Sequence, residues 1–233
     1  MGFFDLFDNK PLDLNKIEKY TTDLNFVRYM RGLCSDPDDA KSKKIELKRE
    51  IFSLVGDDIL KWTFLHSGLS EAVTNVTHHA YPEGNVFIDK SWYLTGSFNN
   101  SSREMKIAFY DQGVGIPKSL PASKIYERVL NFLTKTGVNV IEKMSDKVLL
   151  EAAMSIDRTS TEKNDRGKGL QDLIEFIKQR GQGYISILSY KGLYKFTLDN
   201  NKEHVKTASF DLPLCGTLII WSVTLDNKEP SNG

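Results

Sequence analysis

Glu71 and Asn75 are the first residues whose types and spacing suggest chemistry. They lie four residues apart in a stretch whose apolar residues recur every three or four positions, which indicates a helix with one buried face. Both side chains would then project from the same side of that helix. An amide oxygen there could hold a hydrated metal ion while the acid activates a water or a hydroxyl. The alternative is a polar seam along the helix that neighbouring backbone groups satisfy.

A second candidate site combines a carboxylate with two glycines, at Asp111, Gly113 and Gly115. It follows directly after residues 104–110, a run typical of a strand whose end is buried on both faces. A carboxylate accepts hydrogen bonds and cannot donate them, so Asp111 suits an exocyclic amine such as that of adenine. The glycines allow a sharp turn and the close approach of a ligand. A tight turn with a capping aspartate is the alternative.

A third candidate site would bind phosphate at the start of a helix. Gly167 and Gly169 leave backbone N–H groups open to an anion, and the helix dipole favours negative charge there. Leu170 begins the apolar face of this helix. Nearby side chains would add positive charge and hydroxyl donors: Ser160, Thr161, Lys163, Arg166 and Lys168. The chain contains neither a Walker A loop nor a G-x-G-x-x-G motif after a strand.

The spacing of apolar residues predicts the elements that must position these sites. Helical spacing covers residues 12–33, 39–55, 65–81, 125–133, 140–156 and 167–181. Runs typical of strands occupy residues 85–88, 91–94, 104–110, 184–190, 193–198, 205–212 and 217–225. Residues 157–166 are polar without periodicity, and we expect a mobile loop there. The basic face of the 39–55 helix is interpreted as solvated, with a polyanion site as the alternative.

Composition limits the classes of partner. The chain has 31 basic and 31 acidic residues, which argues against a general nucleic-acid or membrane-surface binder. Cys34, Cys215 and the four histidines show no zinc-ligand spacing, and so few cysteines are typical of a reducing cytoplasm. Residues 3–7 are apolar but do not form a signal peptide, and no run reaches transmembrane length. We therefore expect a cytoplasmic protein.

Taken in order along the chain, these motifs resemble the GHKL ATPase superfamily of gyrase B, the heat-shock chaperone ATPase, histidine kinases and MutL. The resemblance covers roughly residues 58–225 and includes Gly216 and Thr217. Residues 70–75 are most similar to the anti-sigma-factor serine kinases, which also follow this string with a histidine-containing segment. The resemblance implies an α/β fold: a two-layer α/β sandwich with a mixed β-sheet (the Bergerat-type ATP-binding fold), with N-terminal helices and a long helical ATP lid.

The resemblance also implies a domain organisation. Residues 1–57 would form an arm and helices packed on the core. Residues 58–226 would form the ATP-binding domain, with the lid at about 116–166, and residues 227–233 would be a frayed tail.

The same resemblance assigns roles to individual residues. Asn75 would hold the Mg²⁺ ion that bridges the phosphates of ATP, and Glu71 would be the general base. Asp111 would accept a hydrogen bond from the adenine amine, supported by Thr217, with Gly113 and Gly115 shaping the pocket. The phosphate cradle would comprise Ser160, Thr161, Arg166, Gly167, Lys168, Gly169 and Leu170. His79 would approach the ribose or the phosphates, with a structural role at the helix end as the alternative.

Two functions follow from the resemblance. The first is an ATP-dependent serine/threonine protein kinase that regulates a protein partner, such as an antagonist with a STAS-like fold. The second is an ATPase whose slow hydrolysis switches the lid and arm between two arrangements through a homodimer, in a chaperone-like, repair, toxin or defence role. Histidine kinases usually carry an amide where Glu71 stands, so the acid favours hydrolysis or hydroxyl phosphorylation. The long lid departs from the compact anti-sigma kinases, and no hairpin with a phosphoacceptor histidine is present.

Overall fold

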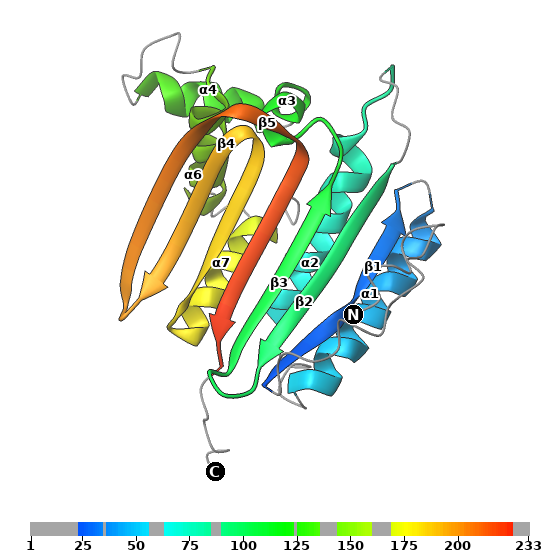
Figure 1. Ribbon diagram of the computed structural model, residues 1–233. Helices are drawn as coiled ribbons and strands as arrows, with labels where there is room; N and C mark the ends of the chain where they lie inside the picture. Colours follow the sequence, from blue (N-terminus) through cyan, green and yellow to red (C-terminus); the bar gives the residue numbers. More distant parts are fainter. Residues whose placement is uncertain are drawn as a thin grey trace.

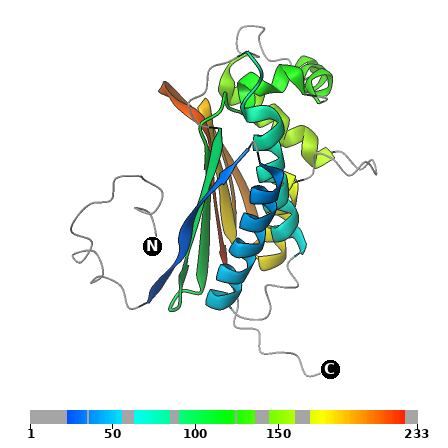
Figure 2. The same ribbon diagram turned by 90° about the vertical axis from the view of Figure 1, so that its right-hand side faces the viewer.

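A computed structural model describes residues 23–34, 36–55, 63–84, 90–123, 125–135, 144–159 and 169–225. In this part, one β-sheet lies against a layer of helices on one of its faces (Figures 1 and 2). This arrangement agrees with the predicted α/β class and its two layers. Residues 1–22, the expected strand at 85–88 and the predicted tail at 227–233 lie outside the described residues.

Groups of strands and groups of helices follow one another along the chain. The strands are β1 (Leu24–Leu33), β2 (Ser91–Asn99), β3 (Glu104–Asp111), β4 (Gly183–Asp199) and β5 (Lys202–Thr224). The helices are α1 (Pro37–Val55), α2 (Thr63–Asn75), α3 (Ile116–Ser119), α4 (Tyr126–Lys135), α6 (Asp146–Thr159) and α7 (Gly169–Arg180). A π-helical turn, η4 (Val76–Ala80), continues α2, and a 3₁₀ turn, η5 (Leu120–Ala122), follows α3.

The strand order is β1-β2-β3-β5-β4, and all four pairings between these strands are antiparallel. The prediction of a mixed sheet is therefore wrong for the described strands. Short turns connect β2 to β3 and β4 to β5, and such hairpin connections give antiparallel neighbours, whereas parallel neighbours need a crossover. The sheet nevertheless places the end of β3 in register with residues inside β5 and β4, which matters for the candidate site.

The prediction of a helix at the N-terminal end of the described chain is also wrong. Residues 24–33 form β1, which pairs with β2 at one edge of the sheet. Val27 and Met30 are both buried, although three residues apart, because the register shifts between them at a β-bulge. A three-residue spacing of apolar side chains thus fits a bulged strand as well as a helix.

Two long, bent strands, β4 and β5, are present where four strands were predicted. β4 changes direction near Tyr190, which has a φ of 52°, and its pairing with β5 shifts register on both sides of this residue. The two arms of β4 then lie side by side (Figure 1), with Lys195 Nζ 4.5 Å from the centre of the Tyr184 ring. The predicted strands at 184–190 and 193–198 are these two arms. The last strand begins at Lys202, so Thr217 lies within β5 rather than at its start.

The buried apolar residues form two clusters. The larger fills the space between the sheet and the helices α1, α2 and α7, and includes the fully buried Trp221 and Phe176. The smaller joins the 3₁₀ turn to α4 and α6 through Leu120, Val129 and Leu149. The predicted helices at 125–133 and 140–156 correspond to α4 and α6. The 3₁₀ turn, α4 and α6 thus form a packed unit with its own apolar core.

The predicted loop at 157–166 is partly helical, because α6 continues to Thr159. Residues 160–168 lie outside the described residues.

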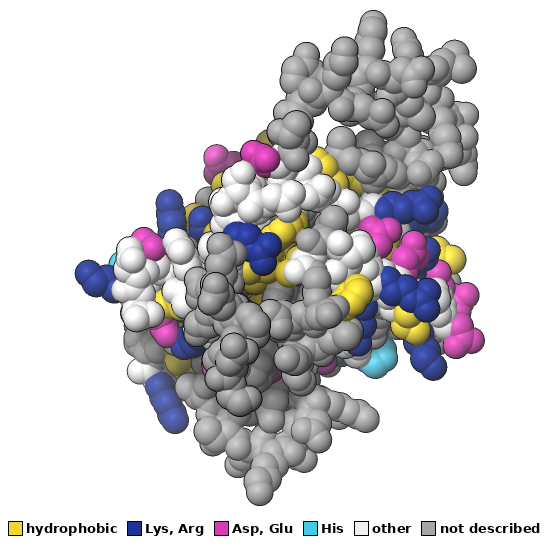
Figure 3. Space-filling model, turned by 90° about the horizontal axis from the view of Figure 1, so that it is seen from below, with side chains coloured by type: hydrophobic (Ala, Val, Ile, Leu, Met, Phe, Trp, Pro, Cys, Tyr) yellow, Lys and Arg dark blue, Asp and Glu magenta, His cyan; other side chains and the backbone are white. Residues whose placement is uncertain are grey.

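Among the helices that the structure describes, none has the length and apolar character needed to cross a membrane. At the end of the sheet opposite Asp111, acidic and basic side chains are interspersed on the surface (Figure 3).

Candidate functional site

Asp111 lies at the end of β3 and is almost completely buried. Its backbone is in register with Trp92 on one side and Thr217 on the other, and its side chain is 3% exposed. The backbone N–H of Gly113 donates to Asp111 Oδ1 at 2.8 Å, and the backbone N–H of Thr217 also donates to this carboxylate. Burial raises the pKa of Asp111 to about 6, although these two hydrogen bonds act in the opposite direction. A buried carboxylate with a raised pKa marks this end of the sheet as a candidate site.

Gly113 brings the Asp111 loop against the end of the α2 helix. A Cβ atom at Gly113 would lie 2.3 Å from the carbonyl oxygen of Ala80, so no larger residue fits without a backbone shift. The N–H of Val114 donates to the same carbonyl at 2.8 Å. Ala80 closes the π-helical turn that continues α2. The structure therefore joins the first two predicted motifs, the Glu71–Asn75 helix and the Asp111 loop.

Gly115 and Gly216 shape the backbone around the carboxylate. Gly115 has a φ of 83° and precedes α3, and Gly216 has a φ of 89°. A Cβ atom at Gly216 would lie 2.0 Å from the carbonyl oxygen of Asp111. Gly216 therefore permits the close approach of β5 to the end of β3.

Three polar residues form a row across neighbouring strands, and motif analysis missed one of them. Asp111, Thr217 and Ser189 are in register on β3, β5 and β4, and all three are buried. Ser189 Oγ lies 2.9 Å from Thr217 Oγ1 and accepts a hydrogen bond from the N–H of Ile116 at 2.7 Å. Ser189 follows Ile185 and Ile187 at alternate positions of a strand, so a polar residue on an inward-facing, apolar row was the available signal.

Glu71 and Asn75 lie nearer the N-terminus of α2 than Ala80 does and are half-buried. Buried residues on this helix, such as Val73 and Val76, face the core, and the two polar side chains lie on its flank. Since they precede Ala80 by nine and five residues, they lie about 13 Å and about 8 Å from it along the helix axis. The structure thus places them on the element that reaches Asp111, at a distance from the carboxylate itself.

The start of α7 lies beside the middle of α2. The two helices are antiparallel neighbours, because α2 ends beside the Asp111 loop whereas α7 ends next to Gly183 at the opposite end of the sheet (Figure 1). The hydroxyl of Ser67 on α2 donates to the carboxylate of Asp172 on α7. Gly169, three residues before Asp172, therefore lies near the level of Glu71. Gly169 and Leu170 are in the first turn of α7, but Ser160, Thr161, Arg166, Gly167 and Lys168 lie outside the described residues.

His79 is exposed at the end of the α2 segment. Its ring contacts that of His78 edge-on, with centroids 6.0 Å apart. Partial burial and the charge of His78 lower the pKa of His79. Within the described ranges, no three or more His, Cys, Asp or Glu side chains are grouped to hold a metal ion.

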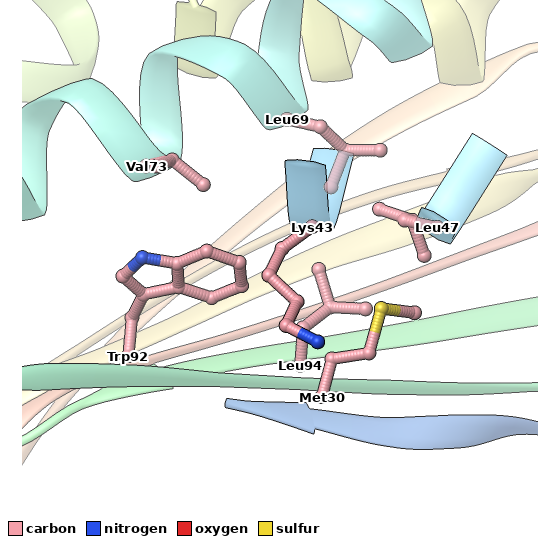
Figure 4. A pocket seen from close by; sticks show the side chains of 7 residues that line it. All are labelled: Met30, Lys43, Leu47, Leu69, Val73, Trp92 and Leu94. Carbon is pink, nitrogen blue, oxygen red and sulfur yellow. The ribbon is translucent and has the colours of Figure 1, made fainter. Parts of the chain in front are cut away.

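A small pocket lies elsewhere and does not contribute to this site. It is enclosed by α1, α2, β1 and β2, with a volume of about 10 Å³ (Figure 4). Six apolar side chains and Lys43 line it, and the Lys43 ammonium pairs with Glu46 at 2.9 Å. This volume is at most that of a single water molecule, so the pocket is a packing gap.

No protein-family model matches the chain, and no curated protein matches it significantly. The evidence for a function therefore comes from the residues and their geometry.

Replacing Gly216 by alanine is expected to destabilise the protein by about 3 kcal/mol or more, since it combines backbone strain with a collision against Asp111. Gly181→Ala is the matched control. Gly181 also has a positive φ, of 78°, but a Cβ atom there would meet no atom within 4 Å, so about 1 kcal/mol is expected. Urea unfolding of both variants measures the difference. Equal losses would show that the contact with Asp111 tolerates a methyl group.

Proposed function

We propose that this protein binds Mg-ATP at the Asp111 end of its sheet and transfers the γ-phosphate to a serine or threonine of a protein partner. One observation carries the proposal. The buried Asp111 carboxylate is held by the N–H groups of Gly113 and Thr217, directly against the end of the helix that carries Glu71 and Asn75.

The environment of Asp111 supports recognition of an amine. Burying a carboxylate is costly unless a partner compensates the charge. Two backbone N–H groups use part of its accepting capacity, and an ionised carboxylate has about four acceptor sites. The exocyclic amine of adenine can donate to one of the remaining acceptor sites of the carboxylate. The Thr217 hydroxyl, on the adjacent strand, supplies a second polar group for the base.

Glu71 and Asn75 suit the phosphate end of the same nucleotide. They lie about 13 Å and about 8 Å before Ala80 on α2, so a nucleotide whose base is at Asp111 would extend along this helix. The N-terminus of α7, near the level of Glu71, offers N–H groups and a favourable dipole to the phosphates. Base and phosphate sites would therefore follow one another along α2.

The chain's own residues would perform the reaction as follows. The amide oxygen of Asn75 fits the preference of Mg²⁺ for oxygen ligands, and the ion, when bound, would neutralise charge on the phosphates. Glu71 accepts the proton of the acceptor hydroxyl. The hydroxyl oxygen then bonds to the γ-phosphorus as the bond to the β-phosphate bridging oxygen breaks, which releases ADP. Positioning and charge stabilisation supply most of the rate.

Labelled ATP tests the proposal. The protein is incubated with magnesium and γ-labelled ATP, with and without a lysate of its native host. Transfer predicts label on a protein of the lysate, whereas label that appears only as free phosphate would establish hydrolysis and overturn the kinase assignment.

The adenine assignment has its own test by calorimetry. Asp111→Asn is expected to weaken ATP binding about tenfold, because the amide replaces a charged acceptor by a neutral one. Asp211→Asn, at an exposed position of β5, is the matched control and should bind as the wild type does. Unchanged affinity in the Asp111 variant would refute the role of Asp111.

A further inference from the structure

The Ser189 hydroxyl lies behind the proposed base site and has three polar neighbours. It is completely buried, on the first arm of β4 just before the bend. The N–H of Ile116 donates to Ser189 Oγ at 2.7 Å, Thr217 Oγ1 lies 2.9 Å away, and the carbonyl oxygen of Gly216 lies 3.5 Å away. These contacts connect the base site to the first turn of α3, which opens the lid region.

The short contact between the Ser189 and Thr217 hydroxyls allows two directions of donation. A serine hydroxyl has one proton to donate and can accept from two donors. The N–H of Ile116 can only donate, so it occupies one acceptor site of Ser189. At 2.9 Å either hydroxyl can donate to the other, and the Gly216 carbonyl at 3.5 Å, the limit for a hydrogen bond, is the longer-range acceptor for the Ser189 proton.

One of these directions leaves the Thr217 proton for a ligand. When Thr217 Oγ1 accepts from Ser189, its own proton is not used in that contact. The hydrogen bonds to the neighbouring Asp111 carboxylate come from the backbone N–H groups of Gly113 and Thr217. We propose that Ser189 is a positioning residue that holds the Thr217 hydroxyl as a hydrogen-bond donor to the bound purine, beside the acceptor Asp111. This inference rests on the proposed nucleotide site.

The same serine is anchored by the lid region. Lys118 of α3 places its Nζ atom 3.7 Å from the centre of the Tyr190 ring, next to Ser189. Gly192, two residues further on, packs against the backbone of Asp146 at the start of α6. Helices α3 and α6 therefore hold the β4 bend in place, and the bend holds the hydroxyl that orients Thr217.

A double-mutant cycle in nucleotide binding tests the proposal. ATP affinity is measured by calorimetry for the wild type, Ser189→Ala, Thr217→Val and the double variant. Ser189→Ala is expected to weaken binding about fivefold and Thr217→Val by at least as much. If Ser189 acts through Thr217, the double variant binds no more weakly than Thr217→Val alone.

The possible results separate this inference from the proposed function. If the ATP affinity of the double variant falls by the product of the two single-variant factors, Ser189 acts independently of Thr217, as an anchor of α3, and the inference is overturned. If the wild type binds no ATP, the proposed function is overturned and the inference with it. Urea unfolding checks each variant; if Ser189→Ala does not fold, Ser189→Cys replaces it in the same cycle.

Discussion

Replacing Glu71 by glutamine is expected to lower the rate of phosphoryl transfer from bound Mg-ATP by about 10²- to 10⁴-fold, the usual contribution of a general base. The amide has the size of the acid but cannot accept the proton of the attacking hydroxyl. ATP affinity should change by less than about threefold, because Glu71 lies about 13 Å along the helix from Ala80, the residue that contacts the loop of the base-binding Asp111. A loss of rate without a loss of affinity is the signature of an interaction that is made in the transition state.

Single-turnover measurements separate this chemical step from nucleotide binding. The protein is saturated with labelled ATP, and the transfer of label is followed over time, while calorimetry gives the affinity. Glu175→Gln on the exposed face of α7 is the matched control, since it removes one negative charge near the same helix pair. A Glu71→Gln variant with the rate of the wild type would show that Glu71 is not the general base. A variant that binds no ATP would show that Glu71 is needed for binding.

The parts of the site that could be predicted from sequence are those that depend on local patterns. Asp111 and the two glycines after it follow a strand whose end is apolar throughout, and the end of a strand is fixed by residues near it in sequence. The α2 helix was predictable because its apolar residues recur at helical spacing. The contact that joins the two motifs, between Gly113 and Ala80, depends on tertiary packing and is visible only in the structure.

The sequence-based predictions are wrong where one spacing of apolar residues fits two structures. They are incomplete where the partner of a strand or side chain is distant in sequence. Residues 24–33 have a spacing that a helix and a bulged strand share, and pairing with β2 decides between them. Two of the four strand pairings follow from hairpin connections, and the directions of the other two depend on tertiary packing that apolar spacing does not reveal. Ser189 carries no motif, and its role becomes visible only when β4, β5 and β3 align it with Thr217 and Asp111.

Asp111→Asn is expected to make the protein more stable at neutral pH while it weakens ATP binding. The pKa of Asp111 is about 6 in the folded protein and 3.8 in the reference state. Between these values the folded state holds a proton that the unfolded state has lost, so protonation stabilises the fold. The stability of the wild type therefore falls as the pH rises from about 4 to about 6, by about 3 kcal/mol in total, and stays at the lower level above that range.

The asparagine variant lacks this dependence because an amide does not ionise, while its oxygen can still accept from the N–H groups of Gly113 and Thr217. At pH 7 it should be more stable than the wild type by about 1–3 kcal/mol, the range reflecting the cost of burying an amide N–H₂ group. Urea unfolding from pH 4 to pH 8 measures this, with Asp211→Asn as the exposed control, which should follow the wild type.

A less stable Asp111→Asn variant at pH 7, or a wild type whose stability does not fall between pH 4 and pH 6, would contradict the raised pKa. The combination of higher stability with weaker ATP binding has a specific physical meaning. It indicates that the folded chain alone does not compensate the buried charge of Asp111 and that a bound ligand with a donor group does. The stability measurement therefore tests the candidate site without requiring that the acceptor of the phosphate be known.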